Sequence, residues 1–233
     1  MDPQKAGEGP DRPDRPWVCV NFAMSTDGKL ALPDGTPVKI SSEEDMLRVH
    51  QMRASSDAIL VGVSTIVADD PKLHVSPKRV SDPPALLKII LDSSGRTPTD
   101  ACLFDSPGET LIATVDGTEQ DLVERLGDCA DVVPFGPGPM VDLHSLIQHL
   151  AIRGVKKLMV EGGGETIWSF VSSGLVDEVT CYVGPMVIGG GGSPTPADGP
   201  GAKDLSQVIG LELLTAERLG EGVWMRYRVT GRP

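Results

Sequence analysis

The sequence predicts an α/β fold with a mostly parallel central sheet and an antiparallel edge formed by the last part of the chain. Short apolar runs of strand length alternate with segments of helical periodicity over most of the 233 residues. Two strand-like runs, near residues 211–218 and 223–229, then close the chain with no helix between them. Because no linker separates two cores, residues 17–233 are predicted to form a single domain. Residues 1–16, rich in Asp, Arg and Pro, are predicted to be a disordered tail.

Three apolar runs in the first half of the chain are predicted to be buried strands: residues 17–24, 57–63 and 86–91. The first run ends before Asp27-Gly28, which is a strong turn signal. Ser42 and the acidic residues after it begin a helix, because they bond its free N–H groups and complement its dipole. This helix ends near Ser55. A shorter segment after the second strand stops at Pro71.

The alternation continues in the second half of the chain. Four more strands are predicted, at residues 110–115, 130–134, 157–161 and 178–183. Three helices are predicted among them, at residues 119–126, at residues 142–150 and from the glycines after residue 161 to about residue 173. Asp142 is expected to cap the second of these helices.

Composition excludes several classes of partner. A formal net charge of −12 argues against a polyanion, and an aromatic content of 4% argues against base stacking on nucleic acid. The four cysteines are scattered without a C-x-x-C pair, so neither a metal site nor a disulfide framework is expected. No apolar stretch approaches the length of a membrane span. We expect a cytoplasmic protein with no metal, no nucleic-acid partner and no membrane partner.

Three consecutive glycines, Gly162, Gly163 and Gly164, separate Glu161 at the end of a strand from the next helix. This arrangement brings backbone N–H groups and a helix N-terminus against a phosphate or pyrophosphate, and a Cβ would hold that ligand away. The run is neither a G-x-G-x-x-G fingerprint nor a Walker A loop. A helix start that merely turns tightly is therefore an equal alternative on spacing alone. Glu161 favours a site, because ligands of open α/β sheets bind outside the carboxyl ends of the strands.

Four predicted strand ends carry polar residues and glycines: Ser25-Thr26-Asp27-Gly28-Lys29, Gly62-Val63-Ser64-Thr65, Asp92-Ser93-Ser94-Gly95 and Glu161-Gly162-Gly163-Gly164. Each alone is typical of a plain turn, but in a parallel sheet three or four of them would converge on one edge. Thr65 and Asp69 share one face of a helical turn, either as ligands of cofactor hydroxyls or phosphate, or as an N-cap and a solvated acid. Arg53 either complements its helix dipole or captures a substrate phosphate or carbonyl.

The absence of known catalytic motifs limits the types of reaction that the protein is expected to catalyse. The sequence has no G-x-S-x-G nucleophile elbow, no H-E-x-x-H pair and no cysteine beside an evident base. Glycine N–H groups next to a carboxylate are typical of an enzyme in which a bound cofactor, and not a protein side chain, performs the main chemical step.

At this point the chain resembles the pyrimidine reductases of riboflavin biosynthesis, which have a dihydrofolate-reductase-like, three-layer α/β/α fold. The residues that carry the resemblance follow the family order from about residue 17 to the end: Phe22 to Lys29, Arg53 to Gly62, Thr65 to Leu73, Leu91-Asp92-Ser93, Val160 to Gly164, Gly174 to Glu178 and Pro194 to Gly199. The stand-alone form and the glycine-rich loop before Pro194 are most similar to the archaeal type of 2,5-diamino-6-ribosylamino-4(3H)-pyrimidinone 5′-phosphate reductase.

The resemblance implies a homodimer that uses NADPH, or in some members NADH, to reduce the ribosyl group of that pyrimidine phosphate to ribityl. It implies these cofactor-binding residues: Thr65, Asp69, Leu91, Asp92, Ser93, Gly162, Gly163, Gly164, Glu165 and Thr166. It implies that Asp27, Arg53, Leu73 and Glu161 bind the substrate. Glu161 or a bound water is the candidate proton donor for the ring oxygen, so Glu161 is the expected catalytic residue.

Three positions depart from the bacterial fused relatives: Asn21 replaces a lysine, no tryptophan stands near Lys39, and Ser76 replaces an arginine. The last change leaves the substrate phosphate without its usual cation, and we expect Lys78 or Arg79 to neutralise it. Two other functions fit the same scaffold. One is reduction of dihydrofolate, another pterin or another carbonyl compound, and the other is dinucleotide binding without catalysis.

Overall fold

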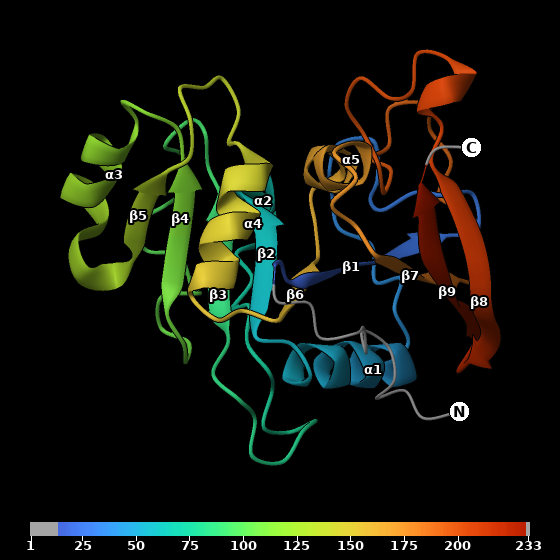
Figure 1. Ribbon diagram of the computed structural model, residues 1–233. Helices are drawn as coiled ribbons and strands as arrows, with labels where there is room; N and C mark the ends of the chain where they lie inside the picture. The colour runs from blue at the N-terminus through green and yellow to red at the C-terminus, as the bar shows by residue number, and fades with distance from the viewer. Residues whose placement is uncertain (1–13, 232–233) are drawn as a thin grey trace.

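A computed structural model describes residues 14–231 of the chain (Figure 1). Its strands are β1 Trp17–Ser25, β2 Ala58–Gly62, β3 Leu87–Leu91, β4 Thr110–Thr114, β5 Asp131–Pro134, β6 Lys157–Val160, β7 Glu178–Gly184, β8 Gly210–Leu219 and β9 Gly222–Gly231. Its α-helices are α1 Glu43–Ala54, α2 Val63–Asp69, α3 Glu119–Leu126, α4 Leu143–Ile152 and α5 Gly164–Ser172. The side chains of Ser42 and Asp142 cap α1 and α4, as expected.

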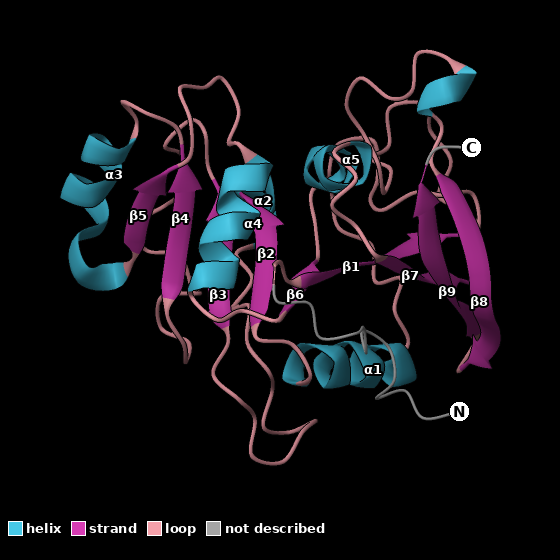
Figure 2. Ribbon diagram, viewed as in Figure 1, coloured by secondary structure: helices cyan, strands magenta, loops and turns pink. Residues whose placement is uncertain are grey.

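The strands form one nine-stranded sheet in the order β5-β4-β3-β2-β6-β1-β7-β9-β8 (Figure 2). The first seven strands of this order are parallel to one another. β9 is antiparallel to β7, and β8 is antiparallel to β9. The predicted mostly parallel sheet with an antiparallel edge is therefore confirmed.

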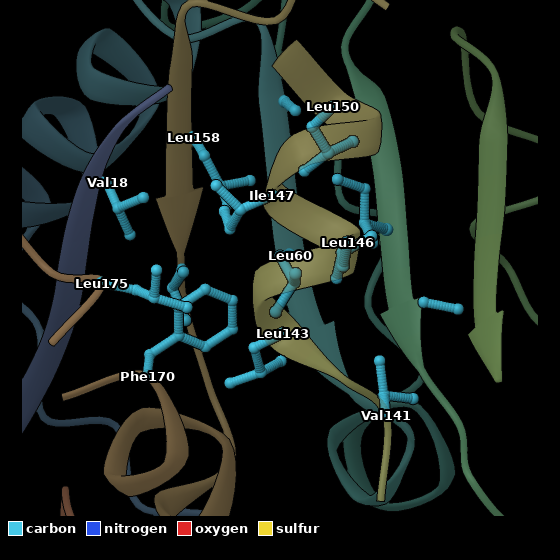
Figure 3. Packing of buried hydrophobic residues seen from close by; sticks show 14 of the residues in the cluster. Val18, Leu60, Val141, Leu143, Leu146, Ile147, Leu150, Leu158, Phe170 and Leu175 are labelled. Atoms are coloured by element: carbon cyan, nitrogen blue, oxygen red, sulfur yellow. The ribbon is translucent and has the colours of Figure 1, made fainter. Parts of the chain in front are cut away.

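Helices cover both faces of the sheet, which gives the predicted three layers. On one face α4 and α5 pack against the even-numbered residues of β1, β2 and β6, and Leu146 and Phe170 are fully buried there (Figure 3). On the other face, Ile59 and Val61 of β2 pack with Ile66 of α2, and α3 belongs to the same cluster. α1 covers Cys19 and Met159 on that second face. Because β2 and β6 are covered on both faces, their buried residues are apolar, and only Lys157 at the start of β6 is charged.

The amino-terminal part of the described chain is fixed to the sheet. Arg15 donates hydrogen bonds to both carboxylate oxygens of Asp177, at 2.8 and 2.6 Å. Asp177 also accepts the N–H of Val18 at 2.9 Å, which ties the start of β1 to the segment before β7. Most of the predicted tail, residues 1–13, lies outside the described residues. Within residues 14–231, none of the helices has the length and apolar character needed to cross a membrane.

Candidate active site

The four polar strand ends lie next to one another at the carboxyl edge of the sheet. They follow β3, β2, β6 and β1, which are consecutive in the sheet order, so the predicted convergence is present. From β2 the chain continues through α2 to β3, whereas from β6 it continues through α5 to β7 on the opposite side. Neighbouring strands whose connections leave in opposite directions form a topological switch point, where open α/β sheets bind their ligands. We call this place the β2–β6 edge, made of Gly62–Asp69 and Glu161–Thr166.

The glycines of the β2–β6 edge allow the beginnings of α2 and α5 to pack closely. A Cβ on Gly62 would collide with the Thr166 hydroxyl, and a Cβ on Gly162 would lie 3.2 Å from the Thr65 hydroxyl oxygen. Gly163 has a φ of +81°, which favours glycine. Thr65, the glycines and Thr166 are therefore brought together, as the sequence predicted. The tight helix start is therefore observed, because these glycines serve the packing of α2 and α5. Phosphate binding by the same glycines stays a prediction.

Backbone N–H groups at this edge are available to an anion. No side chain within residues 14–231 caps α5 at Gly163 or α2 at Gly62, in contrast to α1 and α4. The first N–H groups of a helix lack intrahelical partners, and the positive end of the helix dipole lies there. The uncapped nine-residue helix α5 behind a positive-φ glycine therefore fits a pyrophosphate.

We call residues 162–166, which form the start of α5 and the glycines before it, the glycine cradle. Glu161 and Arg53 form a bidentate ion pair beside the glycine cradle. Arg53 Nε donates to Glu161 Oε1 at 2.7 Å, and an Arg53 terminal nitrogen donates to Oε2 at 2.5 Å. The other terminal nitrogen of Arg53 donates to the backbone carbonyl of His74 at 3.0 Å. The two side chains are 16% and 9% exposed, so the pair is largely withdrawn from water. Burial lowers the pKa of Arg53, but the charge and hydrogen bonds of Glu161 outweigh burial and raise it.

Asp92 shapes the loop that follows β3. Its carboxylate is fully buried and accepts hydrogen bonds from the N–H groups of Arg96 and Thr97 at 3.0 and 2.7 Å, and from the Thr97 hydroxyl at 2.7 Å. The carboxylate is thus satisfied within its own loop. Any contact of this strand end with a cofactor therefore falls to Ser93 and the backbone.

Arg96 is a candidate site residue that the sequence analysis did not identify. Its guanidinium donates to the Ser94 hydroxyl at 2.9 Å and to the Ser64 hydroxyl at 3.1 Å, so it bridges the ends of β3 and β2. Its side chain is exposed. Among residues 14–231 no carboxylate forms an ion pair with it. In the sequence, Arg96 could have been noticed as a cation in the polar loop that follows Asp92 at the end of β3. Its contact with Ser64 could not be predicted, because only the fold brings the two residues together.

The remaining predicted residues lie in different surroundings. Asp69 ends α2 one turn after Thr65, and desolvation by the surrounding protein raises its pKa even though its side chain is exposed in the isolated chain. Leu73 has a φ of +47° and a side chain that is 2% exposed in the core, so only its backbone is available to a ligand. Asp27 lies in the turn after β1 and is bonded to Ser25 and to the backbone of residues 188–189.

The segment with the predicted phosphate-binding cations packs against α1. His50 Nδ1 accepts the N–H of Ser76 at 3.2 Å, and burial together with Arg53 and Arg79 lowers the pKa of His50 to about 4. Arg79 forms an ion pair of 2.7 Å with Glu43 in the first turn of α1. Arg53 donates to the backbone carbonyl of His74, two residues before Ser76, so this segment lies on the Arg53 side of the site.

Asn21, where the fused relatives carry a lysine, faces the interior. Its carbonyl oxygen accepts from Arg48 at 2.9 Å and from the Thr180 hydroxyl at 3.1 Å. Arg48 is 2% exposed, pairs with Asp45 and lies over the Trp224 ring. The side chain at position 21 is thus part of a buried polar network between α1 and the sheet.

A hollow elsewhere on the molecule does not adjoin this chemistry. It is lined by Asp57, Leu86, Gly108 and Arg153, among others, at the amino ends of β2 and β3. Arg153 is engaged there by Glu109 and Asp131. We place the site at the opposite, carboxyl edge because the uncapped helices and the Arg53–Glu161 pair lie there. No cluster of three or more His, Cys, Asp or Glu side chains arranged to hold a metal occurs within residues 14–231.

The fold and this edge define the class of α/β proteins that bind a nucleotide or dinucleotide at a topological switch point. Residues 16–225 match the model of the RibD C-terminal domain. The chain belongs to this family.

Curated relatives extend over almost the whole chain. It is 38% identical over 217 residues to the 2,5-diamino-6-ribosylamino-4(3H)-pyrimidinone 5′-phosphate reductase of Methanothermobacter thermautotrophicus, covering 93% of this chain and 100% of the relative. It is 40% identical over 225 residues to the reductase of the same name from Archaeoglobus fulgidus, covering 94% and 98%. The resemblance to this reductase family and the expected oxidoreductase class are confirmed.

Solved structures have the same fold. RibD of Acinetobacter baumannii has a TM-score of 0.75 at 23% identity, over 93% of this chain and 59% of that chain. The riboflavin biosynthesis reductase Rib7 of Saccharomyces cerevisiae has a TM-score of 0.71 at 19% identity, over 97% and 95%. The dihydrofolate-reductase-like fold class is confirmed. This chain spans about three fifths of the RibD chain, and almost all of Rib7.

Proposed function

We propose that this protein reduces the ribosyl group of 2,5-diamino-6-ribosylamino-4(3H)-pyrimidinone 5′-phosphate to ribityl with a nicotinamide dinucleotide, as a step of riboflavin biosynthesis. The observation that carries the proposal is the buried Arg53–Glu161 pair beside an uncapped glycine cradle at the β2–β6 edge. The two archaeal relatives that carry this name match nearly end to end and support the choice of substrate.

The dinucleotide would be held by Thr65, Asp69, the strand end Leu91–Ser93 and Gly162–Thr166. N–H groups at the start of α5 suit its pyrophosphate, and Thr65 contributes a hydroxyl beside Gly162. When bound, the reduced nicotinamide supplies a hydride to the sugar. The contribution of the chain is to hold the two partners close and to keep water away from them.

The substrate would lie against Arg53, Glu161 and the backbone of Leu73. Opening of the ribosylamine ring requires one proton on the ring oxygen, and either Glu161 or a bound water is the proposed donor. Both oxygens of Glu161 accept hydrogen bonds from Arg53. This favours water as the donor and Glu161 as the group that orients the sugar hydroxyls. Asp27 is the remaining residue that the family resemblance assigns to the substrate.

Lys78 and Arg79 are proposed to neutralise the substrate phosphate in place of the arginine that Ser76 replaces. Arg79 is already held beside the first turn of α1 through its ion pair with Glu43. The double variant Lys78→Ala, Arg79→Ala should raise the substrate KM about tenfold or more, because charge-assisted hydrogen bonds are lost. An unchanged KM would contradict this assignment.

We propose NADPH as the preferred cofactor because of Arg96. An exposed guanidinium held between Ser94 and Ser64, without a paired carboxylate among the described residues, suits the 2′-phosphate that distinguishes NADPH from NADH. The formal net charge of −12 makes such a local cation necessary for binding a phosphate monoester.

The protein is further proposed to be a cytoplasmic homodimer. Leu211 and Leu213 of β8 and Val223 of β9 are 46%, 55% and 41% exposed. In the register of the hairpin, Leu211 and Leu213 face Val229 and Tyr227 and so share one face of the sheet. In Figure 1 the β8–β9 hairpin lies beyond α1 and α5, at the end of the sheet. An apolar sheet face of this kind is suited to packing against a second copy.

An anaerobic assay at 340 nm tests the proposed reaction. The pyrimidine phosphate should drive oxidation of NADPH, with one ribityl product formed for each cofactor oxidised. Turnover of dihydrofolate or another pterin, with none of the pyrimidine phosphate, would support the alternative reductase. Tight cofactor binding without oxidation by any pterin or pyrimidine would support a non-catalytic dinucleotide-binding module.

A further inference from the structure

The carboxylate of Asp27 holds the beginning of a glycine run that is distant in sequence. Its Oδ1 accepts from the Ser25 hydroxyl at 2.6 Å and from the Ile188 N–H at 3.0 Å, and its Oδ2 accepts from the Gly189 N–H at 2.7 Å. The hydrogen bonds from Ser25, Ile188 and Gly189 lower the pKa of Asp27 to about 2. The carboxylate is therefore ionised at neutral pH, and both oxygens are engaged within the protein.

The turn that contains Asp27 is bonded to the same distant segment at two other points. The Thr26 N–H donates to the Met186 carbonyl at 2.8 Å, before the glycines, and the Leu30 N–H donates to the Pro194 carbonyl at 2.9 Å, after them. We call residues 188–198 the glycine loop. Asp27 is the only side chain in this turn that binds the N–H groups with which the glycine loop begins, among the described residues.

The glycine loop needs such an anchor because of its composition. It contains four consecutive glycines, Gly189 to Gly192, and Gly189 and Gly190 have φ values of +75° and +83°. A Cβ on Gly189, Gly191 or Gly192 would meet nothing within 4 Å, whereas a Cβ on Gly190 would lie 2.8 Å from a side-chain carbon of Pro33, so three of the four glycines have no close side-chain neighbour. Glycine loses the most conformational freedom on ordering, and fixed hydrogen bonds have to offset that loss.

The far end of the glycine loop packs on the proposed dinucleotide cradle. A Cβ on Gly164, the first residue of α5, would lie 2.7 Å from the Thr195 carbonyl oxygen and 2.6 Å from a carboxylate oxygen of Asp198. That Asp198 oxygen accepts the Thr195 N–H at 3.1 Å, which closes the loop into a compact turn. The glycine loop therefore extends from Asp27 to the helix start that is proposed to receive the pyrophosphate.

We propose that Asp27 is a positioning residue for the dinucleotide site, acting through the glycine loop and without contact with the substrate. The inference rests on the proposed function, because it assigns the cradle at Gly164 to the dinucleotide. It differs from the role that the family resemblance implies for Asp27, which is direct contact with the pyrimidine substrate.

Separate Michaelis constants for the two ligands distinguish the two roles. Asp27→Ala should raise the KM of NADPH about tenfold, through the loss of two backbone hydrogen bonds, while the KM of the pyrimidine phosphate stays within twofold. Asp27→Asn should recover part of the affinity, because its amide oxygen can still accept one N–H. Hydrogen exchange at Ile188 and Gly189 should become faster in Asp27→Ala, and titration of NADPH fluorescence should show the same weakening without substrate present.

Asp34→Ala is the matched control, because Asp34 is also exposed and bonds only the local Thr36 N–H, at 2.9 Å. It should leave both constants unchanged. A raised pyrimidine KM with an unchanged NADPH KM in Asp27→Ala would overturn the proposal in favour of substrate contact, and unchanged values of both would overturn it outright. If the unmodified protein binds neither NADPH nor NADH, the proposed function itself fails, whatever the variants do.

Discussion

At the scale of single residues, the site combines the ion pair of Arg53 and Glu161 with Arg96, which pairs with no carboxylate among the residues that the structure describes. Arg53 and Glu161 satisfy each other through two hydrogen bonds in a largely buried position. Removing one partner from a buried pair leaves an uncompensated charge, which is costly. Arg96, by contrast, is exposed and is held only by two serine hydroxyls. These two arrangements lead to different expectations for substitution.

Glu161→Gln should reduce kcat/KM for the pyrimidine phosphate by at least about tenfold, and should lower the free energy of unfolding by about 2 kcal/mol. The amide keeps the shape of the side chain but cannot accept two hydrogen bonds from Arg53. NADPH affinity should hardly change. Steady-state kinetics and urea unfolding measure these effects. Glu212→Gln, which disrupts the exposed pair with Arg228, is the control and should cost less than about 0.5 kcal/mol. Equal effects of the two variants would contradict the assigned role of Glu161.

Arg96→Ala should lower kcat/KM for NADPH about tenfold and leave kcat/KM for NADH unchanged, because only NADPH carries the 2′-phosphate. Parallel assays with the two cofactors measure the ratio. Arg218→Ala is a suitable control, since Arg218 is exposed and bonds only the Gly220 carbonyl in its own turn. Equal losses with both cofactors would show that Arg96 supports the loop and does not discriminate between the cofactors.

Several residue roles could not be predicted from the sequence, because they depend on which segments meet. The carboxylates of Asp27 and Asp92 looked available for ligands, but the fold surrounds them with hydrogen-bond donors from residues 188–189 and 96–97. Leu73 looked like a substrate contact, but its side chain is in the core. The family resemblance placed both Glu161 and Arg53 at the substrate, but their direct pairing was not predicted.

At the scale of elements, the beginnings of α2 and α5 pack together across the β2–β6 edge. Gly62 has extended backbone angles, φ −78° and ψ 152°, that any residue can adopt. Its lack of a side chain therefore serves only the close approach of Thr166. The sequence located the nine strands and the helices α1, α3, α4 and α5 to within a few residues, because the apolar periodicity is strong and the caps at Ser42 and Asp142 are present. It left the segment of α2 unassigned. It could not predict this contact, which joins elements a hundred residues apart.

Gly62→Ala should lower the free energy of unfolding by about 1 to 3 kcal/mol, because the added methyl group collides with the Thr166 hydroxyl. Dinucleotide affinity should fall as α5 is displaced. The double variant Gly62→Ala, Thr166→Ala should recover much of the stability, since the clash is removed. Gly191→Ala, where a Cβ meets nothing within 4 Å, is the control and should change stability by only a few tenths of a kcal/mol. Thermal unfolding of the three variants and the unmodified protein measures this, and a neutral Gly62→Ala would contradict the packing argument.

At the scale of the whole molecule, the proposed ligand site and the proposed dimer surface lie on different parts of the sheet. Its centre, from β3 to β1, presents the site at the carboxyl ends of the strands. Its antiparallel end, β9 and β8, exposes an apolar face. The alternation of the sequence predicted the parallel centre and the antiparallel edge. The strand order could not be predicted, because β6 is inserted between β2 and β1 from far along the chain, and this insertion creates the switch point.

Leu213→Asp should convert the proposed dimer into a monomer, because a charge in an apolar interface would have to be desolvated without a partner. Multi-angle light scattering should give twice the chain mass for the unmodified protein and the mass of one chain for the variant. Ile152→Asp is the control, since Ile152 is 88% exposed on α4, away from the hairpin. A monomeric unmodified protein would contradict the dimer.

The reduced dinucleotide is proposed to bind at the β2–β6 edge. A crystal structure of the protein with NADPH would show where it binds. We expect the pyrophosphate between Thr65 and the N–H groups of Gly163 to Thr166, with the nicotinamide directed toward the Arg53–Glu161 pair. Well-defined density for the cofactor at another position, such as the hollow beside Arg153 at the opposite edge of the sheet, would contradict the claim.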